Sequence, residues 1–222
     1  MKTGIIIVAS GRGSRMGGPV PKQFALLKGR PVLMHTIEKF HNALKDSRII
    51  LVIPSSELSL WKKLCLEYNF NIPHDITFGG DNRFDSVKNG LKRASYCNII
   101  GIHDGVRPLV TEKVITSTKL TAEQYGCAIP AVPVSDSLRR YADTENKIVD
   151  RSGLYAVQTP QFFKKRIIMD SYDTEFSPEF TDDASVAEKK GYAIHITDGD
   201  PLNIKLTTPA DMIIAEAILS AI

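Results

Sequence analysis

Residues 3–22 read TGIIIVASGRGSRMGGPVPK. The apolar run from Ile5 to Val8 is β-branched throughout, which favours a buried strand, and residues 9–22 form a loop with four glycines and three cations. Glycines let backbone N–H groups approach phosphate oxygens closely, and lysine or arginine side chains balance the charge. A strand that leads directly into such a loop predicts a phosphate-binding site at the carboxyl end of that strand.

Two common phosphate-binding loops do not match this one. A dinucleotide fingerprint requires a small residue where Met16 stands, and a Walker A loop requires Gly-Lys-Ser/Thr where residues 18–20 read GPV. The serines of the loop lie in no Gly-x-Ser-x-Gly motif, so a serine nucleophile is not indicated. The pattern therefore predicts a phosphate loop of another kind.

The glycines and cations of this loop are expected to divide the work. Gly11 and Gly13 are expected to cradle phosphate groups, while Arg15 and Lys22 neutralise the charge that develops on the phosphate that reacts. Arginine can bind two oxygens at once, whereas lysine supplies a point charge.

Outward from the loop, β-branched runs alternate with helical patterns, which predicts a mostly parallel α/β sheet flanked by helices. The strand-like runs are residues 49–53 and 99–102, and the helical patterns are residues 32–40 and 60–68. Phe84, Val87 and Leu91 also fall at helical spacing. The run at 99–102 leads into His103 and Asp104, so polar side chains are expected where a strand ends.

Two further segments have clear local signals. Thr208, Pro209 and Asp211 have the spacing of an N-cap, a first helical residue and an acidic third residue, so they predict a last helix that ends near Ile222. Residues 130–159 instead show alternation and turn residues without a helical stripe. We interpret residues 133–158 as a β-arm inserted into a single domain that spans 1–222.

Length and composition exclude several classes of protein. A chain of 222 residues with 43% apolar residues suits one core, and a net charge of +3 does not indicate a nucleic-acid partner. Three cysteines that are far apart predict neither a disulfide framework nor a zinc site. The apolar run at the N-terminus is too short for a signal peptide or a membrane span, so we expect a cytoplasmic protein without a membrane partner.

Six further blocks extend the pattern along the chain. Together with the Gly-x-Gly-x-Arg-Met loop and Pro21-Lys22, they make the sequence resemble the 2-C-methyl-D-erythritol 4-phosphate cytidylyltransferases of the non-mevalonate isoprenoid pathway. The resemblance implies a Rossmann-like, GT-A-type nucleotidyltransferase fold. The six blocks are, in order, residues 79–87 (GGDNRFDSV), 103–108 (HDGVRP), 150–154 (DRSGL), 159–163 (TPQFF), 181–185 (TDDAS) and 203–207 (NIKLT). With the loop that precedes them, they make seven blocks.

The resemblance implies a role for each matching position. Arg15, Lys22 and Lys205 correspond to cations that hold a triphosphate and stabilise the reacting phosphorus. The nucleotide-binding positions are Ala9, Ser10, Gly11, Gly13, Gly80, Asp81, Ser86, Asp104 and Gly105, of which Gly80, Asp81 and Ser86 correspond to readers of the cytosine. Asp104 and Arg107 match residues near the ribose and the metal, and the substrate-binding set is Arg107, Ser137, Arg151 and Thr181.

The implied reaction is transfer of CMP from CTP to 2-C-methyl-D-erythritol 4-phosphate, with release of pyrophosphate. Mg²⁺ is the implied cofactor, held largely by the CTP phosphates with Asp104 nearby. In the family the arm hooks onto a second subunit, so the chain is expected to form a homodimer in which Arg151, together with Ser137, acts across the interface.

The sequence departs from the family pattern at a few positions. Val8 and Ser10 stand where proline and alanine are common, and residues 105–106 read GV in place of Ala-Ala; we expect these positions to contribute mainly backbone. Leu202 replaces a frequent acidic residue, so no acidic site residue is assigned there.

Three other functions stay open. A ribitol 5-phosphate cytidylyltransferase has a similar loop and a similar His-Asp-x-x-Arg-Pro motif, and Val106 would suit it. A nicotinamide-dependent oxidoreductase lacks support, because residues 54–56 (PSS) offer no acidic ribose anchor. A non-catalytic nucleotide-binding subunit is disfavoured by the presence of every candidate cation.

Some candidate residues also have ordinary structural interpretations. Asp104 could be a turn cap and Lys205 the exposed position of a half-buried strand, but the motifs favour the site for both. His103 is interpreted as structural, and Arg83 is left out of the predicted site. The other four histidines have no ligand spacing and receive no role.

Overall fold

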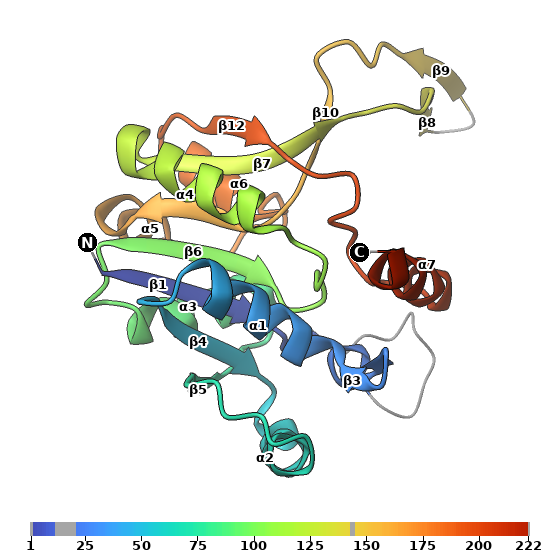
Figure 1. The fold of residues 1–222 in the computed structure, drawn as a ribbon. Helices are drawn as coiled ribbons and strands as arrows, with labels where there is room; N and C mark the ends of the chain where they lie inside the picture. Colours follow the sequence, from blue (N-terminus) through green and yellow to red (C-terminus); the bar gives the residue numbers. More distant parts are fainter. Residues whose placement is uncertain (1, 12–20, 143–144, 222) are drawn as a thin grey trace.

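The structure, a computed structural model, describes residues 2–11, 21–142 and 145–221. Those residues form an eight-stranded main sheet together with two small two-stranded sheets (Figure 1). The main strands are β1 Thr3–Val8, β4 Arg48–Ile53, β5 Asp75–Phe78, β6 Ile99–Asp104, β7 Cys127–Pro133, β10 Tyr155–Val157, β11 Gln161–Lys164 and β12 His195–Asp198. The small sheets pair β2 Leu26–Leu27 with β3 Arg30–Pro31 and β8 Leu138–Ala142 with β9 Glu145–Val149.

The centre of the main sheet is parallel. β1 lies between β4 and β6, with Ile6 opposite Ile50 on one side and Ile102 on the other. β5 continues the parallel part beyond β4, and β12 pairs parallel with β7. β11 runs antiparallel between β6 and β7, and β10 is antiparallel to β7. The predicted mostly parallel sheet is confirmed.

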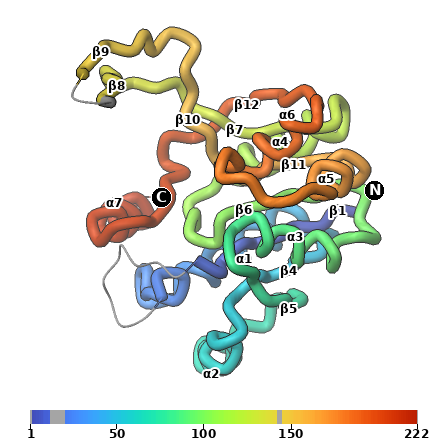
Figure 2. The backbone as a smooth tube through the Cα atoms, turned by 180° about the vertical axis from the view of Figure 1, so that it is seen from behind, coloured from blue at the N-terminus to red at the C-terminus, as the bar shows by residue number. Residues whose placement is uncertain are grey.

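Helices cover both faces of this sheet, as the two opposite views show (Figures 1 and 2). They are α1 Val32–Ala43, α2 Leu58–Glu67, α3 Arg83–Arg93, α4 Glu112–Tyr125, α5 Lys165–Ser171, α6 Asp183–Lys189 and α7 Pro209–Ala221, with short 3₁₀ turns at Lys22–Phe24 and Ser55–Glu57. The predicted helices at 32–40, 60–68 and around Val87 correspond to α1, α2 and α3.

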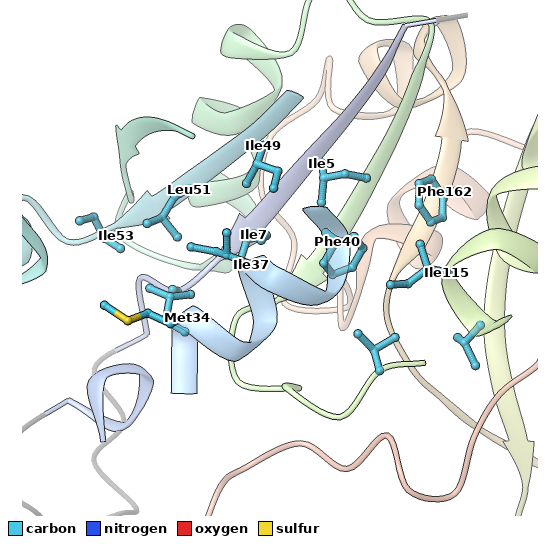
Figure 3. Close-up of a cluster of buried hydrophobic side chains, with 14 of the residues drawn as sticks. Ile5, Ile7, Met34, Ile37, Phe40, Ile49, Leu51, Ile53, Ile115 and Phe162 are labelled. Atoms are coloured by element: carbon cyan, nitrogen blue, oxygen red, sulfur yellow. The ribbon is translucent and has the colours of Figure 1, made fainter. Parts of the chain in front are cut away.

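The central strands are buried on both faces, so each contributes to two cores. Ile5 and Ile7 of β1 pack with α1, α2 and α4, in the cluster that includes Phe40 (Figure 3). Ile6, between them in sequence, points to the other face and packs with α3, α5 and α6. Alternate side chains of one strand thus fix helices on opposite sides, as the period of two requires.

The helices α3 and α6 each begin with a side-chain cap. The Asn82 side chain accepts the N–H of Asp85 at 2.9 Å and starts α3. At α6, Asp182 and Ser185 form a reciprocal capping box. These bonds satisfy N–H groups that a helix leaves open at its first turn.

The last helix follows the predicted signal. The Asp211 carboxylate accepts the N–H of Thr208 at 2.7 Å, and the Asp211 N–H donates to the Thr208 hydroxyl at 3.4 Å. α7 packs through Ala215 on a third apolar cluster, which contains Val106 and Leu206. The chain end is thereby attached to segments that carry predicted site residues.

The inserted segment forms an arm that extends away from the sheet (Figure 1). Its projecting part is the antiparallel pair β8–β9, on which Tyr141 is 74% and Ile148 77% exposed. The base of the arm belongs to the main sheet, because Val157 of β10 pairs with Ala131 of β7. The predicted β-structure is therefore confirmed, while the free part of the arm is shorter than residues 133–158.

Among the residues that the structure describes, no helix combines the length and the apolar character needed to cross a bilayer.

Candidate active site

A cavity of about 420 Å³ lies where β1 and β6 end, at the carboxyl edge of the parallel strands. Ligands of open parallel sheets bind at this edge. Nine predicted site residues line the cavity: Ala9, Ser10, Gly11, Lys22, Gly80, Asp81, Ser86, Asp104 and Lys205. Sequence blocks separated by almost 200 residues thus meet around one space.

Asp104, the last residue of β6, is the centre of a cluster of charges. Its Oδ2 lies 2.9 Å from Lys205 Nζ and 3.5 Å from Arg107 Nε, and its Oδ1 lies 3.5 Å from Arg83 Nε. Burial by itself would raise the pKa of this carboxyl, but the charges of Arg83, Lys205 and Arg107 hold it well below its usual range. Asp104 is therefore ionised, and it keeps three like charges close together.

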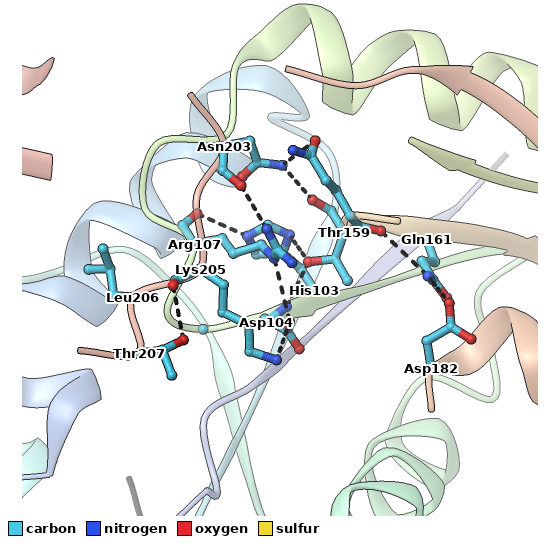
Figure 4. Close-up of polar contacts among 12 residues, drawn as sticks. His103, Asp104, Arg107, Thr159, Gln161, Asp182, Asn203, Lys205, Leu206 and Thr207 are labelled. Carbon is cyan, nitrogen blue, oxygen red and sulfur yellow. Dashed lines mark hydrogen bonds and ion pairs between the residues drawn. The ribbon is translucent and has the colours of Figure 1, made fainter. Parts of the chain in front are cut away.

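His103 fixes the backbone around this carboxylate (Figure 4). Its Nε2 lies 3.1 Å from the Arg107 carbonyl oxygen, which can only accept, so Nε2 carries the proton. The Thr159 hydroxyl then donates to Nδ1 at 3.0 Å and accepts the N–H of Asp104 at 3.1 Å. Complete burial lowers the pKa of His103 to about 3, so the ring stays neutral.

Arg107 is fixed toward the protein rather than the cavity. Its Nη1 donates to the Asn203 carbonyl oxygen at 2.7 Å, and only 13% of its side chain is exposed. The Asn203 side chain in turn donates to the Thr159 carbonyl oxygen at 2.9 Å. Arg107 therefore connects the turn after β6 to the segment that carries Lys205.

The two lysines of the cavity approach this same segment. Lys22 Nζ donates to the Leu206 carbonyl oxygen at 3.2 Å, so the loop after β1 contacts the chain next to Lys205. Lys205 lies outside any strand, and 41% of its side chain is exposed. The half-buried strand considered from the sequence is wrong for this position, because residues 203–207 cross the edge of the sheet as irregular chain.

Arg83, at the start of α3, joins three elements. Its two Nη atoms bind the Asp183 carboxylate at 2.9 and 2.7 Å, and the Tyr172 hydroxyl donates to the same carboxylate at 2.6 Å. Burial would lower the pKa of Arg83, but Asp183 and Asp104 raise it well above the ordinary value. The arginine therefore stays charged while it holds α3, α6 and β6 together.

Small residues and hydroxyls surround the start of α3. Gly80 N–H donates to the Ser86 hydroxyl oxygen at 3.1 Å, and Ser86 donates to the Asn82 carbonyl oxygen at 2.8 Å. Ser10 donates to Ser86 at 2.8 Å, so the loop after β1 is bonded to α3. Gly105 packs closely against the loop after β1. A Cβ atom at this position would lie only 2.9 Å from the Cβ of Ala9.

Some predicted residues lie elsewhere or outside the described chain. Ser137, Arg151 and Thr181 are exposed and do not line the cavity, and Arg107 and Gly105 are not among its lining residues either. Gly13 and Arg15 belong to residues 12–20, outside the described ranges.

Sequence reasoning missed five residues of the wall: Val8, Gln23, Asn82, Arg83 and Val106. Gln23 has the clearest chemistry, because it is 1% exposed and its Nε2 has no hydrogen-bond partner among the described residues. A glutamine directly after the cationic Lys22 was the available signal. Arg83 stands in the motif at residues 79–87, but the sequence does not reveal its contact with Asp183, 100 residues later.

The described residues contain no group of three or more His, Cys, Asp or Glu side chains that could hold a metal ion. The carboxylates that line the cavity are Asp81 and Asp104. Mg²⁺ is commonly bound by one or two carboxylates together with substrate phosphates. The residues present therefore fit an ion that enters with a triphosphate rather than an ion held by protein groups alone.

A parallel sheet that gathers lysines and an ionised carboxylate around a cavity at its carboxyl edge suits substitution at the phosphate of a nucleotide. The fold and the cavity together thus define a nucleotidyltransferase. A model of the 2-C-methyl-D-erythritol 4-phosphate cytidylyltransferase family matches residues 3–221. The chain belongs to this family, which confirms the resemblance and makes the protein a cytidylyltransferase.

Individual relatives agree over the full length. The 2-C-methyl-D-erythritol 4-phosphate cytidylyltransferase of Bacteroides thetaiotaomicron is 46% identical over 219 residues, which cover 99% of this chain and 100% of the relative. That of Porphyromonas gingivalis is 42% identical and covers 97% of each chain. The crystal structure of 4-diphosphocytidyl-2C-methyl-D-erythritol synthase from Anaerococcus prevotii superposes with a TM-score of 0.84 at 28% identity, over 99% of this chain and 96% of that one.

Proposed function

We propose that the protein transfers CMP from CTP to the phosphate of 2-C-methyl-D-erythritol 4-phosphate and releases pyrophosphate. The observation that carries this proposal is that Lys22, Lys205 and residues 9–11 of the loop line one cavity. The reaction is that of the relatives, which match this chain from end to end. Ribitol 5-phosphate is the competing acceptor that an experiment has to exclude.

The chemistry requires positioning and charge more than proton transfer. A phosphate monoester is already an oxyanion near neutral pH, so it can attack the α-phosphorus directly without a strong base. His103, neutral and bonded on both ring nitrogens, is not available as a base. Lys22 and Lys205 supply positive charge where the pentacoordinate phosphorus and the leaving pyrophosphate gain negative charge.

Lys205 is the cation of the Asp104 cluster that can turn toward a ligand. It is 41% exposed, whereas Arg107 and Arg83 are 13% and 30% exposed and have other acceptors. When a triphosphate enters, Lys205 can exchange part of its contact with Asp104 for a phosphate oxygen. Asp104 then holds the remaining cations in place.

Mg²⁺ is the proposed cofactor, held by the CTP phosphates with Asp104 as a protein ligand. A divalent ion in this place shares the negative charge of the triphosphate with the lysines. Pyrophosphate release that persists unchanged in excess EDTA would contradict this assignment.

The proposed assembly is a homodimer formed through the β8–β9 arm. Arg151 is exposed and lies outside the cavity of its own subunit, and apolar side chains such as Tyr141 and Ile148 stand on the projecting strands. A second copy that covers the arm would bury these side chains and bring Arg151 to another site. The proposed location is the cytoplasm, which suits the free thiols of Cys65, Cys97 and Cys127.

The test is pyrophosphate release with CTP and Mg²⁺, in which 2-C-methyl-D-erythritol 4-phosphate and ribitol 5-phosphate are offered separately and ATP, GTP and UTP serve as controls. Release that requires CTP and the first acceptor supports the proposal. Preference for ribitol 5-phosphate would keep the mechanism and change the acceptor. Absence of release with both acceptors would overturn the proposed function.

A further inference from the structure

The hydroxyl of Ser86 has no remaining capacity for a ligand. It donates its proton to the Asn82 carbonyl oxygen at 2.8 Å, and it accepts the Gly80 N–H at 3.1 Å and the Ser10 hydroxyl at 2.8 Å. A hydroxyl offers one donor and two acceptor sites, so all three are occupied. Ser86 is also only 1% exposed. A base in the cavity would have to break one of these bonds to reach it.

The polarity of this chain of bonds determines what Ser10 presents to the cavity. The Asn82 carbonyl can only accept and the Gly80 N–H can only donate, so the Ser86 proton points to Asn82. The proton of Ser10 therefore points to Ser86. The lone pairs of Ser10 Oγ remain for a ligand, and Ser10 is a half-buried residue of the cavity wall.

Gly79 holds the Ser10 side chain in this place. A Cβ atom at Gly79 would lie 2.5 Å from Ser10 Cβ and 2.9 Å from Ser10 Oγ. Only glycine allows this close approach, and its own N–H donates to the Ile53 carbonyl oxygen at 3.0 Å at the end of β4. Ser10 is thus fixed by a bond on one side and by backbone on the other.

We propose that Ser10 Oγ accepts a hydrogen bond from the exocyclic amino group of cytosine and so selects CTP over UTP. The inference rests on the proposed function, and it gives a side chain a role at a position where alanine is common in the family. Ser86 then contributes indirectly, because it orients the Ser10 proton.

The discrimination follows from the group that each base carries at position 4 of its ring. Cytosine offers an amino donor, whereas uracil offers a carbonyl oxygen, which would face the Ser10 lone pairs. Turning the Ser10 proton toward uracil would break its bond to Ser86 and leave an acceptor of a buried hydroxyl unpaired. Sites built to bind a polar group reject analogues that leave the site unpaired.

The test is Ser10→Ala, with kcat/KM measured for CTP and UTP under the same acceptor and Mg²⁺ concentrations. We expect kcat/KM for CTP to fall about tenfold and that for UTP to stay the same or rise, so that the CTP/UTP ratio falls at least about tenfold. Calorimetric binding of CTP and UTP without an acceptor should show the same loss of preference. A ratio equal to that of the wild type would overturn the inference.

Two further variants separate selectivity from general damage. Ser220→Ala removes a serine hydroxyl from the exposed side of α7, where it bonds only within the helix, and should leave both rates unchanged. Ser86→Ala keeps Ser10 but frees its proton, so the CTP/UTP ratio should fall here too. If wild-type protein neither binds CTP nor releases pyrophosphate, the proposed function fails; if it does both and Ser10→Ala keeps the ratio, only the inference fails.

Discussion

The residue that organises the site is Asp104, although it is a poor candidate for chemistry of its own. It is almost completely buried, and it touches cations from three separate segments. Three like charges this close would repel one another strongly in a medium of low dielectric constant. The carboxylate offsets part of this repulsion before any nucleotide is bound, so the cations are already in place when a phosphate enters the cavity.

Lys22→Ala is expected to lower kcat by a factor of about 100 or more, because it removes positive charge from the reacting phosphate. Its Nζ also donates to the Leu206 carbonyl oxygen, so the thermal midpoint is measured to separate any loss of stability from the loss of rate. Steady-state rates and a melting curve measure the two effects. The matched control is Lys62→Ala, an exposed lysine on α2, and a near-normal kcat in Lys22→Ala would contradict the assigned role.

Arg83→Met is expected to destabilise the fold by about 3 kcal/mol, because it leaves the fully buried Asp183 carboxylate without its ion pair. The double variant Arg83→Met/Asp183→Asn removes that charge, keeps an acceptor for Tyr172 and should recover most of the stability. Its kcat/KM should nevertheless stay low, since Asp104 still lacks Arg83. Urea unfolding and pyrophosphate release together test this, and activity that returns with stability would assign Arg83 to the fold alone.

Among the elements, β6 connects the core of the sheet to the candidate active site. It is buried along its whole length, it pairs with β1 and β11, and it ends in His103 and Asp104. The ring of His103 then ties the strand end to Thr159, which precedes β11, and to the turn at Arg107. A buried polar network of this kind is stabilising only while every member is paired.

His103 should therefore make stability depend on pH. Its pKa falls from 6.5 to about 3 on folding, so below pH 6.5 the unfolded chain binds a proton that the folded chain does not. Stability is lost as the pH falls from about 6.5 toward 3, and the loss between pH 7.5 and 5 amounts to about 2 kcal/mol. Asp104 does not contribute between pH 7.5 and 5, because its pKa in the unfolded chain, 3.8, already lies below pH 5.

The measurement is urea unfolding of wild type and His103→Gln at pH 7.5 and 5. The variant has no proton to bind at this position, so its stability should change about 2 kcal/mol less between the two pH values. His41→Gln, the same exchange on the last turn of α1, is measured in parallel as a matched variant. An equal pH dependence in wild type and His103→Gln would show that the buried ring does not titrate as described.

The sequence predicted the elements better than their contacts. Periodicity located α1, α3 and β6, because burial on one face or both leaves a pattern in neighbouring residues. It could not assign Arg83, whose role depends on Asp183 and Tyr172 from distant segments. For Ser10 it predicted mainly a backbone contribution to nucleotide binding. The bond that orients its hydroxyl comes from Ser86, 76 residues later, and is not visible in the local sequence. The single domain over 1–222 stays a prediction.

In the whole molecule, the cavity and the arm are separate features. The cavity lies at the edge of the main sheet, whereas the β8–β9 pair extends away from that sheet (Figure 1). An isolated two-stranded hairpin is at best marginally stable in water. The exposed apolar side chains of the β8–β9 pair suit contact with a partner surface. Two-fold symmetric dimers are the commonest assembly of identical chains.

If Arg151 serves the cavity of the other subunit, two inactive variants should restore activity when they exchange subunits. Lys22→Ala damages the cavity of its own chain, and Arg151→Ala would damage the cavity of its partner. A mixed dimer then has one site with both defects and one with neither. Random exchange of equal amounts makes half of the dimers mixed, so about a quarter of wild-type activity should return.

Each variant alone should stay near its low basal rate, and a mixture of Lys22→Ala with Lys205→Ala provides the matched control. Those two residues line the same cavity of one chain, so their mixed dimers have no undamaged site and should recover nothing. Failure of the first mixture, after exchange has been verified with differently tagged subunits, would place Arg151 at the cavity of its own chain. Because both mixtures contain the same kinds of dimer, recovery in the first alone can only come from a site that two chains complete together.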